Sequence, residues 1–365
     1  MKSILYISHT AWSWIKQRPQ FLAEGLSESY KVDVFYRKSN HFFKNLNPPR
    51  YQDSNFSVTG FRNIPWERIK YIRPERLYPI NKLFWSLEKV DLNKYDYIWV
   101  TDPLLWWLIK KRKFRGKVIY DCMDDLLAFP YYERYPNIVS FTQQEERDLL
   151  LKADVVLFSA QTLKEKLFKR YDISRMCNIV NNAITEEITS YSESIDDIIL
   201  PNNSFVYIGT ISEWFDFDLV ISALQRYKDI NIVLYGPIRM ANPPQHDRLI
   251  YAGSIGHDKV LGLMNKAKAL IMPFVVNELI LSVNPVKLYE YIYSGKPIIS
   301  VRYPETEKFG DYVCLYNNNE EFYSFIEEVI GGASKRDLPA MRKFSLDNTW
   351  RARCNDIKNI LEGHA

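Results

Sequence analysis

The chain has 365 residues and a mass of 43.2 kDa, more than one hydrophobic core usually organises, so the sequence predicts two domains. Hydrophobic residues make up 47% and charged residues 25%, values that exclude a disordered or collagenous chain, and no apolar run approaches the roughly 18 residues that a membrane-spanning helix needs. The net charge of +4 is uneven, because residues 1–117 carry 22 Lys and Arg against 10 Asp and Glu, whereas residues 118–365 carry 26 against 34.

The first half of the chain alternates short apolar runs with amphipathic stretches. This alternation predicts buried strands joined by helices, and therefore a doubly wound parallel sheet. Thr142 and Glu145 have the spacing of a capping box before a helix over residues 144–153, and Ser159 is expected to cap the next helix. We expect the strands at residues 3–8, 32–37, 95–101, 117–121 and 154–159.

A polar and acidic segment without sustained periodicity follows at residues 186–203, and it is typical of a linker between domains. A second α/β series then begins, and residues 344–361 predict a final amphipathic helix. We therefore expect α/β domains at residues 1–185 and 204–343, with a C-terminal helix at residues 344–365. The expected strands of the second series lie at residues 205–209, 230–236, 248–253, 268–274, 296–301 and 312–316.

The spacing of the glycines and cysteines disfavours several classes of nucleotide-binding, metal-binding and disulfide-bonded protein. None of the 13 glycines forms a GxGxxG or P-loop motif, which disfavours dinucleotide dehydrogenases and P-loop NTPases. The four cysteines lie far apart, without the spacing of a zinc site or a disulfide framework, so we expect reduced thiols. The start of the sequence has no small-residue cleavage site, and we expect a cytoplasmic location.

Residues 282–300 contain a helix with recognisable ends. Asn284 is expected to cap this helix, with Pro285 as its first residue, and Gly295 followed by Pro297 to end it. Because ligands of open parallel sheets bind beyond the carboxyl ends of the strands, a helix start at this position is a candidate site.

The first turn of this helix carries chemistry suited to a nucleotide. The free amides of Val286 and Lys287, the helix dipole and the Lys287 ammonium together suit a diphosphate. Glu290 lies three residues beyond Lys287 on the same face, where its carboxylate could accept hydrogen bonds from the vicinal hydroxyls of a ribose. The structural alternative is an ordinary capped helix with an ion pair between Lys287 and Glu290.

Residues 273–300 resemble the donor-binding segment of GT-B glycosyltransferases, in particular those of bacterial teichuronic-acid, capsule and exopolysaccharide pathways. Retaining members of the family carry a Glu, seven residues and a second Glu. Glu290 stands at the second place, which implies a ribose contact, and Ser282 stands at the first, which implies a contact with the donor sugar. Lys287 resembles the lysine of the xanthan glucuronosyltransferase type, which meets the pyrophosphate.

Other segments of the second series resemble nucleotide loops of the same family. Residues 205–216 resemble the opening strand and glycine turn, which would bring Gly209 and Thr210 near the phosphates. Gly236 and Gly253 resemble the loops that frame the nucleobase. Plain turns are the structural alternative for these glycines, and His257 is expected near a helix start and not in catalysis.

Three aspartates, Asp121, Asp124 and Asp125, follow an expected strand of the first series. A carboxylate at this place can take the proton of an attacking sugar hydroxyl, and we take Asp124 as the candidate general base. The resemblance also implies an acidic residue or a histidine at this strand end. The structural alternatives are a helix cap and a metal pair formed by two of the aspartates. The resemblance implies no metal and no cofactor, because the helix dipole and basic side chains neutralise the leaving diphosphate.

Residues 12–26 resemble the acceptor-side loop and helix of the surface-polysaccharide enzymes. The resemblance implies that His9, Trp12 and Arg18 line the acceptor pocket, with Arg18 meeting a lipid-linked diphosphate. The alternative is that Trp12 and Trp14 pack in the domain core.

Residues 62–85 and 106–117 mix aromatic and basic side chains. Such segments suit the headgroup layer of an anionic membrane, and a lipid-linked acceptor would lie at that surface. We therefore take peripheral docking at the inner face of the cytoplasmic membrane as a hypothesis. A solvated basic surface with buried aromatics is the alternative.

The sequence thus predicts a GT-B glycosyltransferase that moves a hexose from a UDP-linked nucleotide sugar to a lipid-linked or saccharide acceptor of a cell-surface polysaccharide. Asp124 would activate the acceptor hydroxyl if the reaction inverts and would orient it if the reaction retains. A non-hydrolysing nucleotide-sugar 2-epimerase and a non-catalytic glycan- or nucleotide-binding module are the alternatives. Nucleic-acid binding is disfavoured because the basic first domain contains no known motif for nucleic-acid recognition.

Overall fold

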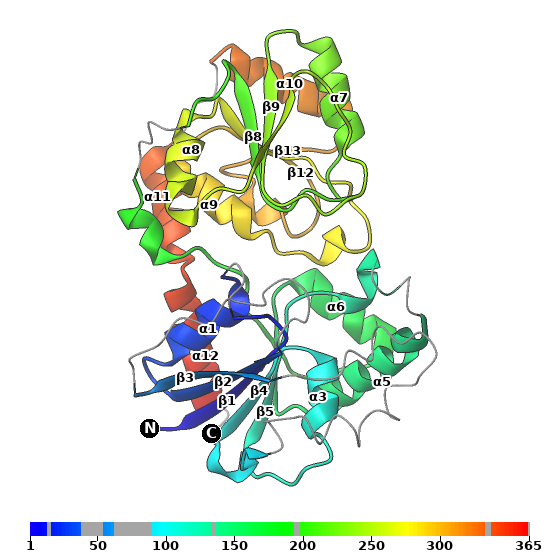
Figure 1. Cartoon of the computed structure of the whole chain (residues 1–365), viewed down its shortest axis with the longest axis vertical. Coiled ribbons are helices and arrows are strands. Elements are labelled where there is room, and N and C mark those ends of the chain that lie inside the picture. The colour runs from blue at the N-terminus through cyan, green and yellow to red at the C-terminus, as the bar shows by residue number, and fades with distance from the viewer. Residues whose placement is uncertain are drawn as a thin grey trace. The chain divides into compact units, whose positions relative to one another are not determined.

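A computed structural model describes residues 1–12, 16–37, 54–61, 89–130, 132, 136–192, 198–332 and 337–363. The chain forms two compact units (Figure 1). The first unit comprises residues 1–181 and 353–365, and the second unit comprises residues 182–352. Each unit contains one parallel sheet with helices, so the predicted α/β class is confirmed.

The sheet of the first unit has, over its described residues, seven parallel strands in the order β3-β2-β1-β4-β5-β6-β7. The central strands β1 and β4 are buried on both faces because their residues are apolar without alternation. The strand order changes direction between β1 and β4, which is where ligands bind in such sheets. The strands are β1 Ser3–Ser8, β2 Lys31–Arg37, β3 Phe56–Phe61, β4 Tyr97–Val100, β5 Lys117–Cys122, β6 Val155–Phe158 and β7 Asn178–Ile179.

Helices cover both faces of this sheet. In Figure 1, α1 and α12 lie on one side of the strands and α3, α5 and α6 on the other. The side chain of Asp102 caps α3, and Trp107 of α3 packs edge-to-face on Phe141 of α5 at 5.4 Å between ring centroids. The helices are α1 Arg18–Leu26, η4 Leu92–Lys94, α3 Pro103–Ile109, η5 Leu126–Ala128, α5 Pro136–Lys152, α6 Gln161–Tyr171 and α12 Trp350–Gly363, the last beginning in the second unit.

The sheet of the second unit has, over its described residues, six parallel strands in the order β10-β9-β8-β11-β12-β13. The direction of the order changes between β8 and β11. Among the described residues, the paired positions of these two strands are Phe205 with Ala269 and Val206 with Leu270. The strands are β8 Ser204–Ile208, β9 Asn231–Tyr235, β10 Leu249–Gly253, β11 Ala269–Met272, β12 Ile298–Val301 and β13 Cys314–Tyr316.

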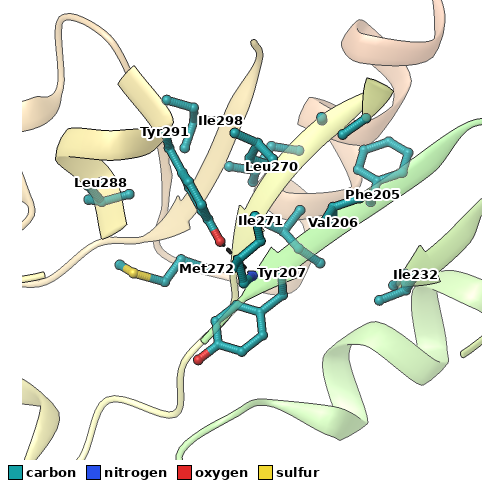
Figure 2. Packing of buried hydrophobic residues seen from close by; sticks show 14 of the residues in the cluster. Phe205, Val206, Tyr207, Ile232, Leu270, Ile271, Met272, Leu288, Tyr291 and Ile298 are labelled. Carbon is teal, nitrogen blue, oxygen red and sulfur yellow. Dashed lines mark hydrogen bonds between the residues drawn. The ribbon is translucent and has the colours of Figure 1, made fainter. Parts of the chain in front are cut away.

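Helix α9 is anchored to this sheet where β8 and β11 separate. The Tyr291 hydroxyl of α9 accepts a hydrogen bond of 2.8 Å from the backbone N–H of Ile208. Figure 2 shows Tyr291 reaching from its helix to the side chains of β8 and β11. The helices of the unit are η6 Glu186–Ser190, α7 Phe217–Arg226, η7 His257–Lys259, α8 Val260–Lys266, η8 Ile280–Ser282, α9 Val286–Ser294, η9 Glu307–Phe309, α10 Asn319–Ile330 and α11 Leu338–Asp347.

The C-terminal segment differs from the single helix expected over residues 344–365. The structure has two helices, α11 and α12, because the chain bends at Asn348 and Thr349. There the backbone bonds to Ile184, whose N–H donates to the Asn348 carbonyl and whose carbonyl accepts from Trp350 N–H. The stretch expected as a linker, residues 186–203, falls within the second unit and opens with the helix η6, while the chain passes between units at Asn181.

Two predicted helix caps are wrong. Helix α5 begins at Pro136, so Thr142 lies buried inside it and Glu145 bonds to Lys110 at 2.6 Å instead of to a helix start. Helix α6 begins after Ala160, and the Ser159 hydroxyl donates to the Met123 carbonyl at 2.7 Å. The four cysteines are free thiols, as predicted.

Candidate functional site

Three glycines end neighbouring strands of the second unit on the same edge of the sheet. Gly209 follows β8, Gly236 follows β9 and Gly253 ends β10. The Gly209 N–H donates to the Tyr235 carbonyl and the Gly236 N–H to the Gly253 carbonyl, each at 2.8 Å. Gly236 has a φ of +144°, and a Cβ atom there would collide with the Gly209 carbonyl oxygen. This edge therefore presents bare backbone, which a ligand can approach closely.

Thr210 continues this edge after Gly209. Its carbonyl accepts a hydrogen bond of 2.9 Å from the Tyr207 hydroxyl, which holds the turn against the sheet. Thr210 and Gly209 are both half-buried. The predicted donor-side residues of β8 and its turn thus lie at the carboxyl edge of the strand.

The start of α9 differs from the prediction by one residue. Val286 is its first residue and Pro285 its N-cap, and no side chain caps the first turn. The prediction that Asn284 caps the helix is wrong, because the Asn284 Oδ1 accepts from the Asn182 N–H at 2.9 Å and its amide nitrogen lies 3.5 Å from Glu305 Oε2. Within the described part of the chain, the amides of the first turn therefore have no capping side chain, as an anion site requires.

Lys287 and Glu290 form the ion pair that the structural alternative for this helix described. The distance from Lys287 Nζ to Glu290 Oε2 is 2.7 Å. Burial raises the pKa of Glu290, but the Lys287 ammonium and the His257 ring together lower it to about 2. Glu290 is therefore a buried but ionised carboxylate at the start of α9, ready to accept hydrogen bonds.

Two residues beside this pair, His257 and Tyr191, were not among the predicted site residues. His257 opens η7 after β10, near a helix start as expected, and its Nε2 lies 3.6 Å from Glu290 Oε1. The Tyr191 hydroxyl lies 2.7 Å from His257 Nδ1. The four side chains come from segments up to a hundred residues apart, and no local motif marks Tyr191 or His257.

Ser282 is buried and is the last residue of η8, the short helix that precedes α9. In the described part of the chain its hydroxyl has no hydrogen-bond partner. A buried hydroxyl that lacks a partner is uncommon in proteins.

The three aspartates at the end of β5 and just after it have different surroundings. Asp121 is fully buried against the Arg18 guanidinium. Asp125 is buried with Arg170 at 2.6 Å and Lys166 at 3.0 Å. Asp124 is half-buried and has no ion pair or hydrogen bond to any described residue.

The pKa of Asp124 is raised by its surroundings. Burial, with the nearby carboxylates of Asp121 and Asp125, raises it to about 7, although Arg18 acts in the opposite direction. Among the described residues, no three His, Cys, Asp or Glu side chains gather where a metal ion could bind. Asp124 is thus the one aspartate of the three whose oxygens are not committed to another described side chain.

The predicted acceptor residues lie in the first unit. His9 follows β1 and its Nδ1 lies 2.8 Å from the Thr101 hydroxyl, while burial lowers the pKa of the ring and keeps it neutral. Trp12 is buried against Phe56 at 6.1 Å between ring centroids, as the core alternative holds. Arg18 is buried in its pair with Asp121, so a contact with an acceptor diphosphate would require this pair to open. Trp14 lies outside the described residues.

No protein-family model matches the chain. A curated relative is TuaH of Bacillus subtilis (strain 168), named as a glycosyltransferase of teichuronic acid biosynthesis, with 26% identity over 246 residues. The alignment covers 62% of this chain and 62% of TuaH, so the chain spans less than two thirds of the relative that it matches.

Solved structures match over almost the whole chain. HepE of Anabaena, in complex with UDP and glucose, has a TM-score of 0.72 at 15% identity and covers 99% of this chain and 100% of its own. Sucrose-phosphate synthase of Thermosynechococcus elongatus has a TM-score of 0.66 at 14% identity, covering 98% and 94%. The lipopolysaccharide outer core galactosyltransferase WaaB has a TM-score of 0.64 at 14% identity over the full length of both chains. These matches, with the two parallel sheets, confirm the predicted GT-B fold and the resemblance to this group of proteins.

Proposed function

We propose that the chain is a glycosyltransferase that moves a hexose from a UDP-sugar to a lipid-linked or saccharide acceptor in the synthesis of a cell-surface polysaccharide. The observation that carries the proposal is the pair of Lys287 and ionised Glu290 at a helix start without a side-chain cap. The helix belongs to the unit in which the strands β8, β9 and β10 end at glycines. The named pathway of TuaH and the UDP and glucose bound by HepE support the substrate classes.

The second unit supplies the donor chemistry. The Lys287 ammonium and the first-turn amides of α9 would receive the diphosphate and stabilise the negative charge that develops on it as the sugar leaves. Glu290 would accept hydrogen bonds from the ribose hydroxyls. Gly209, Gly236 and Gly253 would let the backbone approach the phosphates and the base.

Asp124 supplies the acceptor chemistry in this proposal. Its carboxylate carries no ion pair within the described chain, and its pKa of about 7 suits a base that accepts a proton near neutral pH. In an inverting reaction it would take the proton of the attacking hydroxyl, and in a retaining one it would orient that hydroxyl. His9, neutral and held by Thr101, would contribute a second polar group to the acceptor side.

Membrane docking becomes a narrower proposal. Trp106 and Trp107 are buried in the core of the first unit, so these two aromatic side chains of the segment 106–117 are not available to a membrane. The basic part of the hypothesis rests on the exposed side chains of Lys111 and Lys113. Lys110 of the same segment forms an ion pair with Glu145. The segment 62–85 lies outside the described residues. No helix among the described residues is long and apolar enough to span a bilayer.

The proposal is tested first by binding and then by turnover. A thermal-shift panel of UDP, GDP, ADP and dTDP should show stabilisation by UDP, because a ligand that binds only the folded state raises the melting temperature. UDP-glucose, UDP-galactose and UDP-N-acetylglucosamine then identify the sugar, and proton NMR of the transferred anomeric centre assigns inversion or retention. Epimer formation from UDP-N-acetylglucosamine by the protein alone, or the absence of any nucleotide binding, would contradict the proposal.

A further inference from the structure

Tyr191 and His257 lie next to Glu290 without a part in the function proposed above. The Tyr191 hydroxyl is 2.7 Å from His257 Nδ1, and the two rings meet edge-to-face with centroids 5.4 Å apart. His257 Nε2 is in turn 3.6 Å from Glu290 Oε1. The imidazole therefore bridges the segment after η6 and the carboxylate on α9.

Each oxygen of Glu290 faces a nitrogen of a basic side chain. Lys287 Nζ contacts Oε2 at 2.7 Å, and His257 Nε2 faces Oε1. A carboxylate held at one oxygen can still rotate about its last bond, since rotation about a bond to an sp² carbon is soft. A second group at the other oxygen sets the plane of the carboxylate, and this plane decides where its remaining lone pairs point.

The tautomer of His257 follows from its partner. Burial, with the nearby charges of Glu187 and Glu290, raises the pKa of Tyr191, so its hydroxyl stays protonated. A neutral imidazole that accepts this O–H at Nδ1 carries its own proton on Nε2, and an imidazolium carries a proton on both nitrogens, so in either form the nitrogen that faces Glu290 presents an N–H. The order of groups Tyr191, His257, Glu290 thus directs an N–H towards the carboxylate.

We propose that His257 is a positioning residue that orients the Glu290 carboxylate towards the ribose hydroxyls of the donor, and that Tyr191 selects the required tautomer. The proposal rests on the function proposed above, since it deepens the role of the same site. It predicts that His257 acts through Glu290 and through the ribose hydroxyls alone.

Calorimetry with two ligands tests this. UDP carries both ribose hydroxyls and 2′,3′-dideoxy-UDP carries neither. His257→Ala should weaken UDP binding roughly fivefold, the size of one modest hydrogen bond, and leave dideoxy-UDP binding unchanged. His257→Gln, whose amide can replace the Nε2–H donor, should recover most of the UDP affinity. Tyr191→Phe should give a smaller loss of the same kind.

A double-mutant cycle separates positioning from direct contact. In a Glu290→Ala background, His257→Ala should cause no further loss of UDP affinity. His246→Ala is a matched control, because this histidine precedes β10 at the amino edge of the sheet and its Nδ1 accepts from the Arg248 N–H. It should leave both affinities unchanged.

Three results would overturn the inference: no loss of UDP affinity in His257→Ala, an equal loss for dideoxy-UDP, or a loss that persists in the Glu290→Ala background. If the wild-type protein bound neither UDP nor dideoxy-UDP, the proposed function itself would fall, which is a different result from any of these three.

Discussion

The Arg18 guanidinium and the Asp121 carboxylate form a buried ion pair in which Nε and Nη2 donate to Oδ1 at 3.0 and 2.8 Å. Nη1 donates to the Val180 carbonyl at 2.7 Å. The pair thus joins α1 to the end of β5 and to the segment after β7. It also occupies Asp121 and leaves Asp124, three residues later, as the open carboxylate.

Breaking this pair should destabilise the protein. Arg18→Met removes the cation and leaves the Asp121 charge buried without its partner, which costs about 3–5 kcal/mol of unfolding free energy. Urea unfolding followed by circular dichroism measures the loss. Lys113→Met, at an exposed position, is the control and should change the free energy by less than about 0.5 kcal/mol. A loss in Arg18→Met below about 1 kcal/mol would contradict the burial of an unpaired charge.

Asp124→Asn should keep donor binding and lower turnover roughly 100-fold or more, because the amide cannot accept the acceptor proton. Since burial and the neighbouring carboxylates raise the pKa of Asp124 to about 7, wild-type turnover should rise with pH through about 7 as the carboxylate forms. A radiolabel transfer assay from pH 5 to 9 measures both. Full activity of Asp124→Asn would assign this residue to structure and move attention to His9.

The same aspartate has a readout that needs no acceptor. A pKa that is raised by folding means that the folded protein binds this proton more tightly than the unfolded chain, so the stabilisation is lost as pH rises through about 7. Asp124→Asn should therefore raise the melting temperature at pH 8 and change it much less at pH 4. Equal changes at the two pH values would contradict the raised pKa.

Lys287→Ala should weaken UDP binding by roughly tenfold or more and uridine binding much less, because the ammonium serves the diphosphate. Glu290→Ala should weaken both ligands, since the ribose is common to them. Calorimetry with the two ligands separates the roles. Equal losses for UDP and uridine in Lys287→Ala would show that the ammonium does not meet the diphosphate, and an unchanged uridine affinity would remove Glu290 from the ribose.

Gly236→Ala should destabilise the second unit by about 2 kcal/mol or more, because the new Cβ collides with the Gly209 carbonyl at a backbone angle that L residues avoid. Gly253→Ala is the matched control. Gly253 also has a positive φ, but a Cβ there meets no described atom within 4 Å, so its loss should be smaller. Thermal unfolding with and without UDP compares the two, and equal losses would argue against the close approach of the two turns.

The basic loop after α3 should draw the protein to anionic vesicles. Co-sedimentation with phosphatidylglycerol vesicles is expected at low salt and should weaken as salt rises. Each cation near such a surface contributes roughly 1 kcal/mol, so replacing Lys111 and Lys113 by Gln should reduce binding clearly. Replacing Lys228 and Lys358 by Gln removes the same charge elsewhere and should have little effect. If both double variants lost vesicle binding to a similar extent, the binding would depend on the net charge of the protein and not on this loop.

The strands could be predicted because their signal is local. Runs such as residues 4–7 and 269–272 are apolar over their whole length, which is the pattern of strands buried on both faces. The starts of helices were predicted less well. Glu145 has the spacing of a capping box, but its carboxylate forms an ion pair with Lys110. Spacing along the chain does not show which of two polar partners a side chain meets.

Some contacts of the candidate site could likewise be predicted from the sequence, and others could not. Lys287 and Glu290 could be paired from sequence because they lie three residues apart on one helix. The Arg18–Asp121 pair spans 103 residues and His257 meets Glu290 from another element, so only the packing of the chain reveals them. The membrane-docking hypothesis placed Trp106 and Trp107 on the surface, but both side chains lie in the core.

The hydrogen bond between Tyr291 and Ile208 has a consequence for how the second unit can tolerate changes of length. The hydroxyl fixes the position of α9 along its own axis, and Lys287 and Glu290 stand within about one turn of it. An insertion among the residues between β11 and η8, where Val276 is exposed, would then be absorbed by the loop and would leave the helix in place. Loss of the Tyr291 hydroxyl would release that constraint, and the same insertion would then shift both charged groups relative to the strand ends.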